Sequence, residues 1–190
     1  MANYENIRED LVKATQQQFG LNRLARKLIP PADDGLEGLN YLMQNRKNVM
    51  ITDLGGMQRI AKAAGEVVEY CTKIVHDTDP HIRQGTETVH RNFTNAFEGT
   101  NDNPYALAVL NTTGGQLTVP TTIVEKSQET IEIVNDVSDE DGSEAFGAGK
   151  ENLVEVKNNI AMVGHMTVNI VQNVNSYLAQ QGLPPITVED

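Results

Sequence analysis

The sequence predicts a mainly α-helical protein, an antiparallel helical bundle with a long C-terminal helix, and three observations support this fold class. Residues 150–181 place apolar residues at alternating steps of three and four, the spacing of a helix that packs along one stripe. Aromatic residues make up 5% of the chain and tryptophan is absent, so the core must be aliphatic, which favours a helical bundle over a β-sandwich. Helix start and stop signals also recur at the ends of the periodic segments.

The N-terminal region predicts three short helices. Residues 3–19 have one apolar side and precede Gly20, a residue type that commonly ends a helix. Residues 21–28 form a second segment, which a pair of prolines ends, and a third helix starts at Asp33 or Asp34. We expect residues 1–48 to lie across a main bundle formed by residues 49–190, the whole chain being a single domain.

Two stronger helices follow, over residues 57–77 and 80–98. Asp79 and Pro80 give a clear start signal for the second helix, because an acid at the N-cap and a proline at the first helical position are both favoured there. The connection between the two helices is very short. We therefore expect them to pack antiparallel as a hairpin.

Residues 104–119 support two structures almost equally. Asn103 and Pro104 are a good helix start, and the residues after them have helical propensity. Alternatively, the Gly114-Gly115 pair separates two strand-compatible runs, which is a hairpin signal. The glycine pair favours a short β-hairpin near residues 107–119 slightly.

The next helix is predicted over residues 122–137. Thr122 and Glu125 have the spacing of a capping box, in which each side chain satisfies a backbone N–H of the first turn. An acidic segment, residues 136–144, follows and continues into two glycines at 147 and 149. We expect a mobile loop between this helix and the last one.

The predicted C-terminal helix carries two apolar stripes and one polar face. The first stripe has a heptad spacing: Leu153, Val156, Ile160, Val163, Thr167, Ile170, Val174 and Tyr177. The second stripe has smaller residues: Val154, Ala161, Gly164, Val168, Val171 and Leu178. Two apolar stripes predict a helix placed between neighbours rather than at the rim of a bundle.

The polar face of this helix is almost entirely neutral. Glu155 and Met162 are accompanied there by amides, a hydroxyl and one imidazole, with candidate interface residues Asn158, His165, Asn169 and Gln172. Either this face is exposed to water, or another subunit covers it. Charged residues are depleted at the cores of protein interfaces, so the composition is compatible with both interpretations.

Composition excludes several classes of partner. The chain has a net charge of −11 and a pI near 4.7, so we expect no binding to nucleic acid or to an anionic membrane. The polar N-terminus lacks a secretory signal and no run is long enough to cross a membrane. We expect a soluble protein made in the cytoplasm, and incorporation into a virion or an exported filament remains open. The single cysteine, Cys71, falls on an apolar stripe and excludes an intrachain disulfide.

One basic cluster interrupts this acidic chain, formed by Arg23, Arg26 and Lys27. A short charged run is usually a solvated helix face. The functional alternative is that the cluster pairs with the acidic segment 136–144 of a neighbouring subunit, which would set the orientation of the two copies.

Metal-capable residues concentrate around one predicted helix joint. The weak candidates are His76, Asp77, Asp79, His81, Glu87 and His90. A single Glu-x-x-His motif does not suffice for a di-iron site, which needs two such motifs and two more glutamates. The cap role already explains Asp79. The sequence therefore predicts no metal site, no other cofactor and no catalytic residue.

Three functions remain. The leading hypothesis is a non-enzymatic structural subunit of a homomeric assembly of the virion, tail or secretion-filament type, whose partner is another copy of the chain. One alternative is a metal-dependent helical enzyme or small-ligand-binding bundle centred on His76, Asp77, Asp79 and His81. The other is a regulatory adaptor bundle that binds a partner protein.

Overall fold

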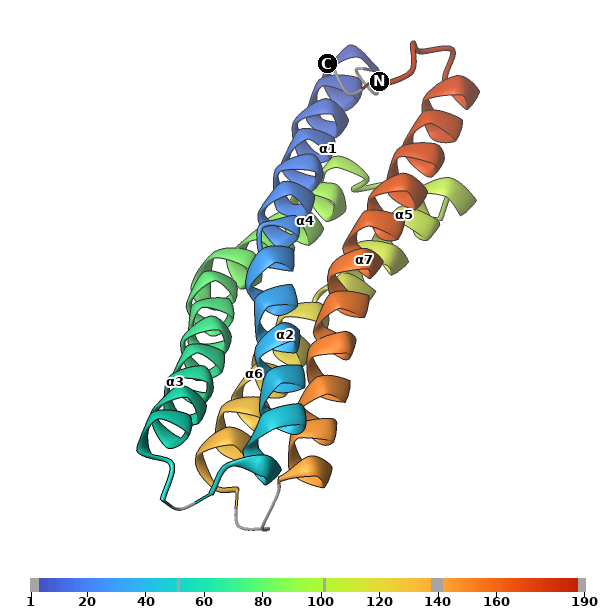
Figure 1. Cartoon of the computed structure of the whole chain (residues 1–190). Helices are drawn as coiled ribbons and strands as arrows, with labels where there is room; N and C mark the ends of the chain where they lie inside the picture. The colour runs from blue at the N-terminus through green and yellow to red at the C-terminus, as the bar shows by residue number, and fades with distance from the viewer. Residues whose placement is uncertain (1–3, 51, 101, 138–141, 188–190) are drawn as a thin grey trace. The chain divides into compact units, whose positions relative to one another are not determined.

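The computed structural model describes residues 4–50, 52–100, 102–137 and 142–187 (Figure 1). Every regular element over these residues is helical and none is a strand, so the protein is mainly α-helical, as predicted. In the part of the chain that the structure describes, no helix combines the length and the apolar content that crossing a bilayer requires.

The elements follow one another with short connections. In chain order they are α1 (Tyr4–Arg26), α2 (Ile29–Asn45), the 3₁₀ turn η1 (Arg46–Asn48), α3 (Leu54–Asp77), the π-type turn η2 (Thr78–Ile82), α4 (Arg83–Ala96), α5 (Pro104–Gln116), α6 (Val119–Asn135) and α7 (Ser143–Gln180).

The chain forms two compact units, each built from four helical segments. Unit 1 contains residues 1–26, 80–120 and 160–190, and so holds α1, α4, α5 and the C-terminal part of α7. Unit 2 contains residues 27–79 and 121–159, and so holds α2, α3, nearly all of α6 and the N-terminal part of α7. The predicted boundary after residue 48 is not one of the boundaries between these units.

The core of unit 1 combines aliphatic residues with a small aromatic group. The Phe97 ring stacks with Phe93 at a centroid distance of 6.4 Å and meets Tyr177 edge-on at 5.1 Å. α4 packs against α1, and Gly85 permits this approach, because a Cβ there would lie 2.9 Å from Leu21 Cδ1. The aromatic residues are few, but three of them are fully or almost fully buried together.

The core of unit 2 is aliphatic and tightly packed. α2 and α3 run antiparallel and pack closely (Figure 1). Two glycines of α2 allow this packing, since a Cβ at Gly38 would lie 2.6 Å from Val67 Cγ2 and one at Gly35 would lie 2.7 Å from Leu153 Cδ1. Cys71 is buried in this core, and burial raises the pKa of its thiol to about 12.

The predicted hairpin at 107–119 is wrong, because this segment is α5 and the start of α6. The Asn103 side chain caps α5, accepting hydrogen bonds from the backbone N–H groups of Tyr105 (2.9 Å) and Ala106 (3.4 Å). Gly114 and Gly115 stay helical because α5 buries one continuous face: Ala106, Val109, Thr113 and Gln116. Tertiary packing thus outweighs the cost of a helical glycine, about 1 kcal/mol each.

Burial of a continuous face also explains why the two separate helices predicted at residues 3–19 and 21–28 are wrong. Gly20 does not end a helix, and the two segments 3–19 and 21–28 are merged into α1 up to Arg26. Leu11, Ala14, Leu21 and Ala25 are all buried on both sides of that glycine. The continuous buried stripe stabilises one long helix in place of two short ones.

The long C-terminal helix exists, but it begins at Ser143 rather than at residue 150. The loop predicted over residues 144–149 is helical, and Phe146 explains this, because its ring is buried and lies 5.9 Å below the Arg46 guanidinium. Gly149 is also buried, against Leu39. Residues 138–141 of the predicted acidic loop lie outside the described residues.

The two predicted helices around residue 79 also differ from expectation. α3 starts at Leu54, three residues before the predicted start, because Asp53 caps it through a 2.8 Å hydrogen bond from Gly56 N–H. Asp79 has an extended backbone (φ −111°, ψ 115°), as an N-cap residue does. The helical hairpin predicted for residues 57–77 and 80–98 placed α3 and α4 in one bundle, whereas α3 belongs to unit 2 and α4 to unit 1.

Candidate functional site

The solvent-exposed side of α7 is the candidate functional site. The heptad stripe predicted from the sequence is buried from end to end: Leu153, Val156, Ile160, Val163, Thr167, Ile170, Val174 and Tyr177. Eight residues are exposed in the part of α7 that belongs to unit 1, and the first six of them are what we call the α7 face: Ala161, Met162, His165, Val168, Asn169 and Gln172.

The α7 face has a repeat of its own. Ala161, His165, Val168 and Gln172 follow one another at steps of four, three and four, which keeps them on one side of a helix. Val168 is 57% exposed and Met162 is 42% exposed, both high values for apolar side chains. The face therefore alternates small apolar residues with neutral polar ones.

No formal charge interrupts the α7 face. The sequence contains no Asp, Glu, Lys or Arg between Lys157 and Glu189, although the whole chain has 26 acidic and 15 basic residues. A neutral amide or imidazole loses less hydration free energy than a carboxylate when another surface covers it. Covering the α7 face with another surface therefore has a comparatively small desolvation cost.

The second apolar stripe of α7, predicted to face a neighbour, is only partly buried among the described residues. Leu178 is buried and Val171 is half-buried, but Val154 is 47% exposed and Val168 more so. The helix is continuous through Gly164, whose position faces Asn22: a Cβ there would lie 3.7 Å from the Asn22 Oδ1. The sequence pattern defined the stripe correctly, but not what packs on it.

The polar residues of the α7 face differ in their bonding. Asn169 Oδ1 accepts hydrogen bonds from Thr112 Oγ1 on α5 (3.0 Å) and from Asn173 Nδ2 (3.2 Å), so its position is fixed. The described residues provide no hydrogen-bond partner for the side chains of His165 and Gln172. Two polar groups thus remain available to a second molecule.

The other predicted interface residues are also exposed. Asn158 is exposed on the part of α7 that belongs to unit 2. Arg23 and Arg26 are exposed in the last turn of α1, and Lys27 is exposed directly after it. The partner predicted for this basic cluster, the acidic segment 136–144, is described only at residues 136–137 and 142–144.

The metal candidates are close in sequence but divide between the two units. His76, Asp77 and Asp79 belong to unit 2, whereas His81, Glu87 and His90 belong to unit 1. His90 Nδ1 is within hydrogen-bond distance of Thr113 Oγ1, at 2.7 Å. The described residues bring together no group of three or more metal-ligating side chains. The alternative of a metal-dependent enzyme stays a prediction.

A buried polar layer in unit 1 escaped the sequence analysis. The amides of Gln18 and Gln116 form two reciprocal hydrogen bonds of 2.8 Å each, and Gln18 Nε2 also donates to Thr167 Oγ1 at 2.9 Å. All three residues are buried. The signal that pointed to this layer was Thr167, a polar residue within an otherwise apolar heptad stripe.

Comparisons with known proteins do not assign this chain to a family. No model of a known protein family matches the chain, and no curated protein is similar to it. The functional argument therefore depends on the surface and the interior of the molecule itself.

Proposed function

We propose that this protein is a non-enzymatic structural subunit of a homomeric assembly, of the virion, tail or secretion-filament type, and that copies contact one another through the α7 face. The observation that carries the proposal is the exposure of Met162 and Val168 among neutral polar residues, on a helix surface without a formal charge. Exposed apolar residues that repeat along one surface are typical of a protein interface.

Charge supports the choice of this surface. Each copy carries a net charge of −11, so two copies repel one another over most of their surfaces. Contact is favoured where acidic side chains are absent, because no carboxylate then loses its hydration or faces another carboxylate. The α7 face meets this condition, and its heptad spacing suits packing against a second helix.

The α7 face is too small to be the whole interface. A stable protein–protein interface buries roughly 800 Å² per partner, which corresponds to 20 or more residues on each side. Residues outside α7 must therefore contribute. The exposed basic cluster Arg23, Arg26 and Lys27 fits this role, since it would attract the acidic surface of a neighbouring copy.

A single charge on the α7 face tests the proposal. We expect the molar mass of the wild-type chain to rise with concentration in size-exclusion chromatography with light scattering. We expect Val168→Glu to need at least a tenfold higher protein concentration to reach the same molar mass. That shift corresponds to about 1.4 kcal/mol.

The matched control is Leu54→Glu. Leu54 is 71% exposed at the start of α3 in unit 2, so the change adds the same charge to an exposed apolar site outside the α7 face. A wild-type chain that stays monomeric at millimolar concentration, or an equal effect of the two variants, contradicts the proposal.

A further inference from the structure

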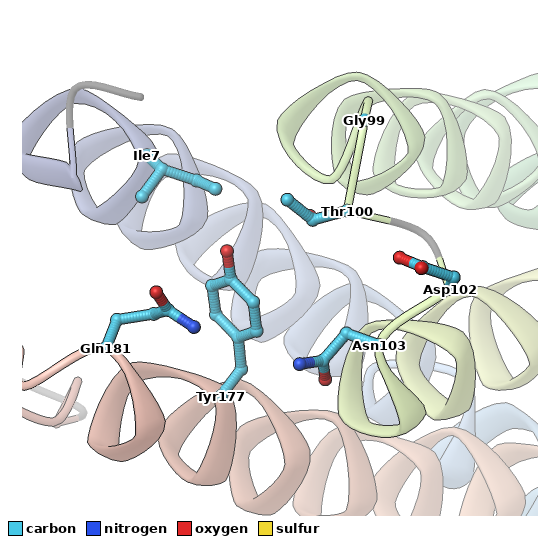
Figure 2. A pocket seen from close by; sticks show the side chains of 7 residues that line it. All are labelled: Ile7, Gly99, Thr100, Asp102, Asn103, Tyr177 and Gln181. Carbon is cyan, nitrogen blue, oxygen red and sulfur yellow. The ribbon is translucent and has the colours of Figure 1, made fainter. Parts of the chain in front are cut away.

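A cavity of about 330 Å³ lies at one end of unit 1 (Figure 2). Ile7 contributes from the start of α1, Thr100, Asp102 and Asn103 from the α4–α5 connection, and Tyr177 and Gln181 from the end of α7. All of these residues belong to the same unit. The cavity is separate from the α7 face, so the inference drawn from it does not depend on the proposed function.

Tyr177 is a buried polar residue aimed into this cavity. Its side chain is 2% exposed and its ring packs edge-on against Phe97. The hydroxyl points away from α7, towards Ile7 and Thr100 (Figure 2). The described residues give this hydroxyl no hydrogen-bond partner. The hydroxyl oxygen itself is not fully buried, in contrast to Ser127 Oγ, so it is accessible from the cavity and can bond to a molecule that enters it.

The wall formed by the α4–α5 connection is held in place by hydrogen bonds within the connection and to α7. Asn103 caps α5 with its Oδ1 and donates from Nδ2 to Gln180 Oε1 at 2.8 Å. Thr100 Oγ1 donates to the Phe97 carbonyl at 3.1 Å. The cavity therefore exists before any ligand enters it, as is usual for small-molecule sites.

Three polar groups of the lining are left for a ligand: the Tyr177 hydroxyl, the Gln181 amide and the Asp102 carboxylate. The described residues provide no hydrogen bond or ion pair for either of the last two side chains. Among the described residues of the lining, Asp102 alone carries a formal charge, and it is exposed to solvent. The guanidinium of Arg8, next to Ile7, donates to the carbonyls of Pro184 and Pro185 at 3.0 and 2.9 Å.

The lining selects the chemistry of the ligand. A carboxylate accepts hydrogen bonds and attracts a cation, so an ammonium group suits Asp102. The Tyr177 hydroxyl and the Gln181 amide can each donate and accept a hydrogen bond, so they suit a hydroxyl or amide on the ligand. The methylene groups that join this group to the ammonium suit the apolar side chain of Ile7. We propose that this cavity binds a small aliphatic ammonium compound that carries a hydroxyl or amide group several carbons from the nitrogen.

Three probes of matched length test this proposal on the full chain. They are 5-amino-1-pentanol, 1,5-pentanediol and glutarate, and binding is followed by the backbone amide NMR signals of Thr100, Asn103 and Gln181. We expect saturable shifts with the amino alcohol, at least fivefold weaker binding of the diol, and no binding of glutarate. A buffer with 150 mM salt screens the general attraction of amines to this acidic chain.

Two variants locate the site. Tyr177→Phe removes the hydroxyl and keeps the ring against Phe97, and Asp102→Asn removes the charge. We expect each to weaken binding of the amino alcohol at least fivefold. Glu98→Gln is the control for charge, since Glu98 is exposed close to the cavity but is not part of its lining. Unchanged melting temperatures confirm that the variants fold.

Several outcomes overturn the proposal. One is the absence of saturable shifts with 5-amino-1-pentanol up to tens of millimolar. Another is equal affinity for the amino alcohol and the diol, which assigns the cavity to neutral polar molecules. The third is an Asp102→Asn effect no larger than that of Glu98→Gln, or a Tyr177→Phe variant that binds like the wild type.

Discussion

The interiors of the two units specify helix packing in different ways. Unit 1 contains a polar layer, in which Gln18 of α1 bonds to Gln116 of α5 and Thr167 of α7. Two buried polar side chains of unit 2 bond to their own helices instead: Thr130 Oγ1 donates to the Lys126 carbonyl and Asn159 Nδ2 to the Glu155 carbonyl. Bonds between side chains of different helices discriminate between alternative registers, whereas bonds within one helix do not. In unit 2 the polar contacts between helices are at the surface, such as the 2.6 Å ion pair of Lys157 with Asp33.

Close approach of helices at glycines occurs in both units, and it is tightest between the helices of unit 2. Gly35 and Gly38 of α2 leave room for Leu153 and Val67, and Gly149 of α7 faces Leu39 at 3.3 Å from a hypothetical Cβ. A shifted register would place side chains where these glycines now admit a neighbour. The comparison teaches that one chain can determine helix register by directional bonds in one region and by close packing in another.

The largest expected effect comes from opening the polar layer. Gln116→Ala removes both reciprocal bonds, leaves the buried Gln18 Oε1 without a donor and creates a cavity, while Gln18 Nε2 keeps its bond to Thr167. We expect the free energy of unfolding to fall by about 2–4 kcal/mol in urea denaturation.

The double variant Gln18→Leu with Gln116→Leu is the control for this prediction. Replacing both partners by apolar groups of similar size leaves no unsatisfied amide, so we expect a loss below about 1 kcal/mol. If the free energy of unfolding falls as much in the double variant as in Gln116→Ala, then hydrogen bonding is not what distinguishes unit 1.

A smaller effect is expected from Gly38→Ala in unit 2. The added methyl group would meet Val67, which is fully buried, so α2 and α3 must move apart. We expect a loss of about 1–3 kcal/mol in the free energy of unfolding, measured in the same way.

Gly65→Ala is the matched control within α3, since a Cβ there has no atom within 4 Å. Gly65 is exposed, so we expect the free energy of unfolding of this variant to rise by about 0.5–1 kcal/mol, because alanine has a higher helix propensity than glycine. Two variants that change stability in the same direction would refute the role assigned to close packing.

The smallest effect is expected at Ser127 in unit 2. Its Oγ is buried and has no hydrogen-bond partner among the described residues. Ser127→Ala removes this unsatisfied group with almost no change of volume, so we expect a gain of up to about 1 kcal/mol in the free energy of unfolding. A clear loss of stability by calorimetry would reveal a bond that the hydroxyl makes in solution.

Local sequence signals located most helices but not all of their starts: α2 begins at Ile29 rather than at Asp33 or Asp34, and α6 begins at Val119 rather than at Thr122. The stripe from Leu153 to Tyr177 is buried as its spacing required, and the Asn103-Pro104 pair does start a helix. Glycines were the main source of error. Gly20 and the Gly114-Gly115 pair were interpreted as a stop and a turn, yet each lies inside a helix. A propensity cost of about 1 kcal/mol is small beside the burial of a continuous apolar face.

The candidate sites were less accessible to sequence reasoning. The neutral face of α7 was recognised because amide-rich residues recur along a single helix, a pattern within one segment. The cavity around Tyr177 was not, since Ile7, Asp102 and Gln181 come from three distant parts of the chain. The same holds for the pairing of Gln18 with Gln116, which only the packing of α1 beside α5 creates.

By itself, the sequence determined the helical class, the stripe of α7 that faces inward and the absence of charge over residues 158–188. Only the tertiary structure decided that Val168 is exposed and Leu178 buried, although both belong to one predicted stripe. The physical reason is that helical periodicity determines which residues share a side. Burial depends on the segments that pack against that side, and these lie far away in the sequence.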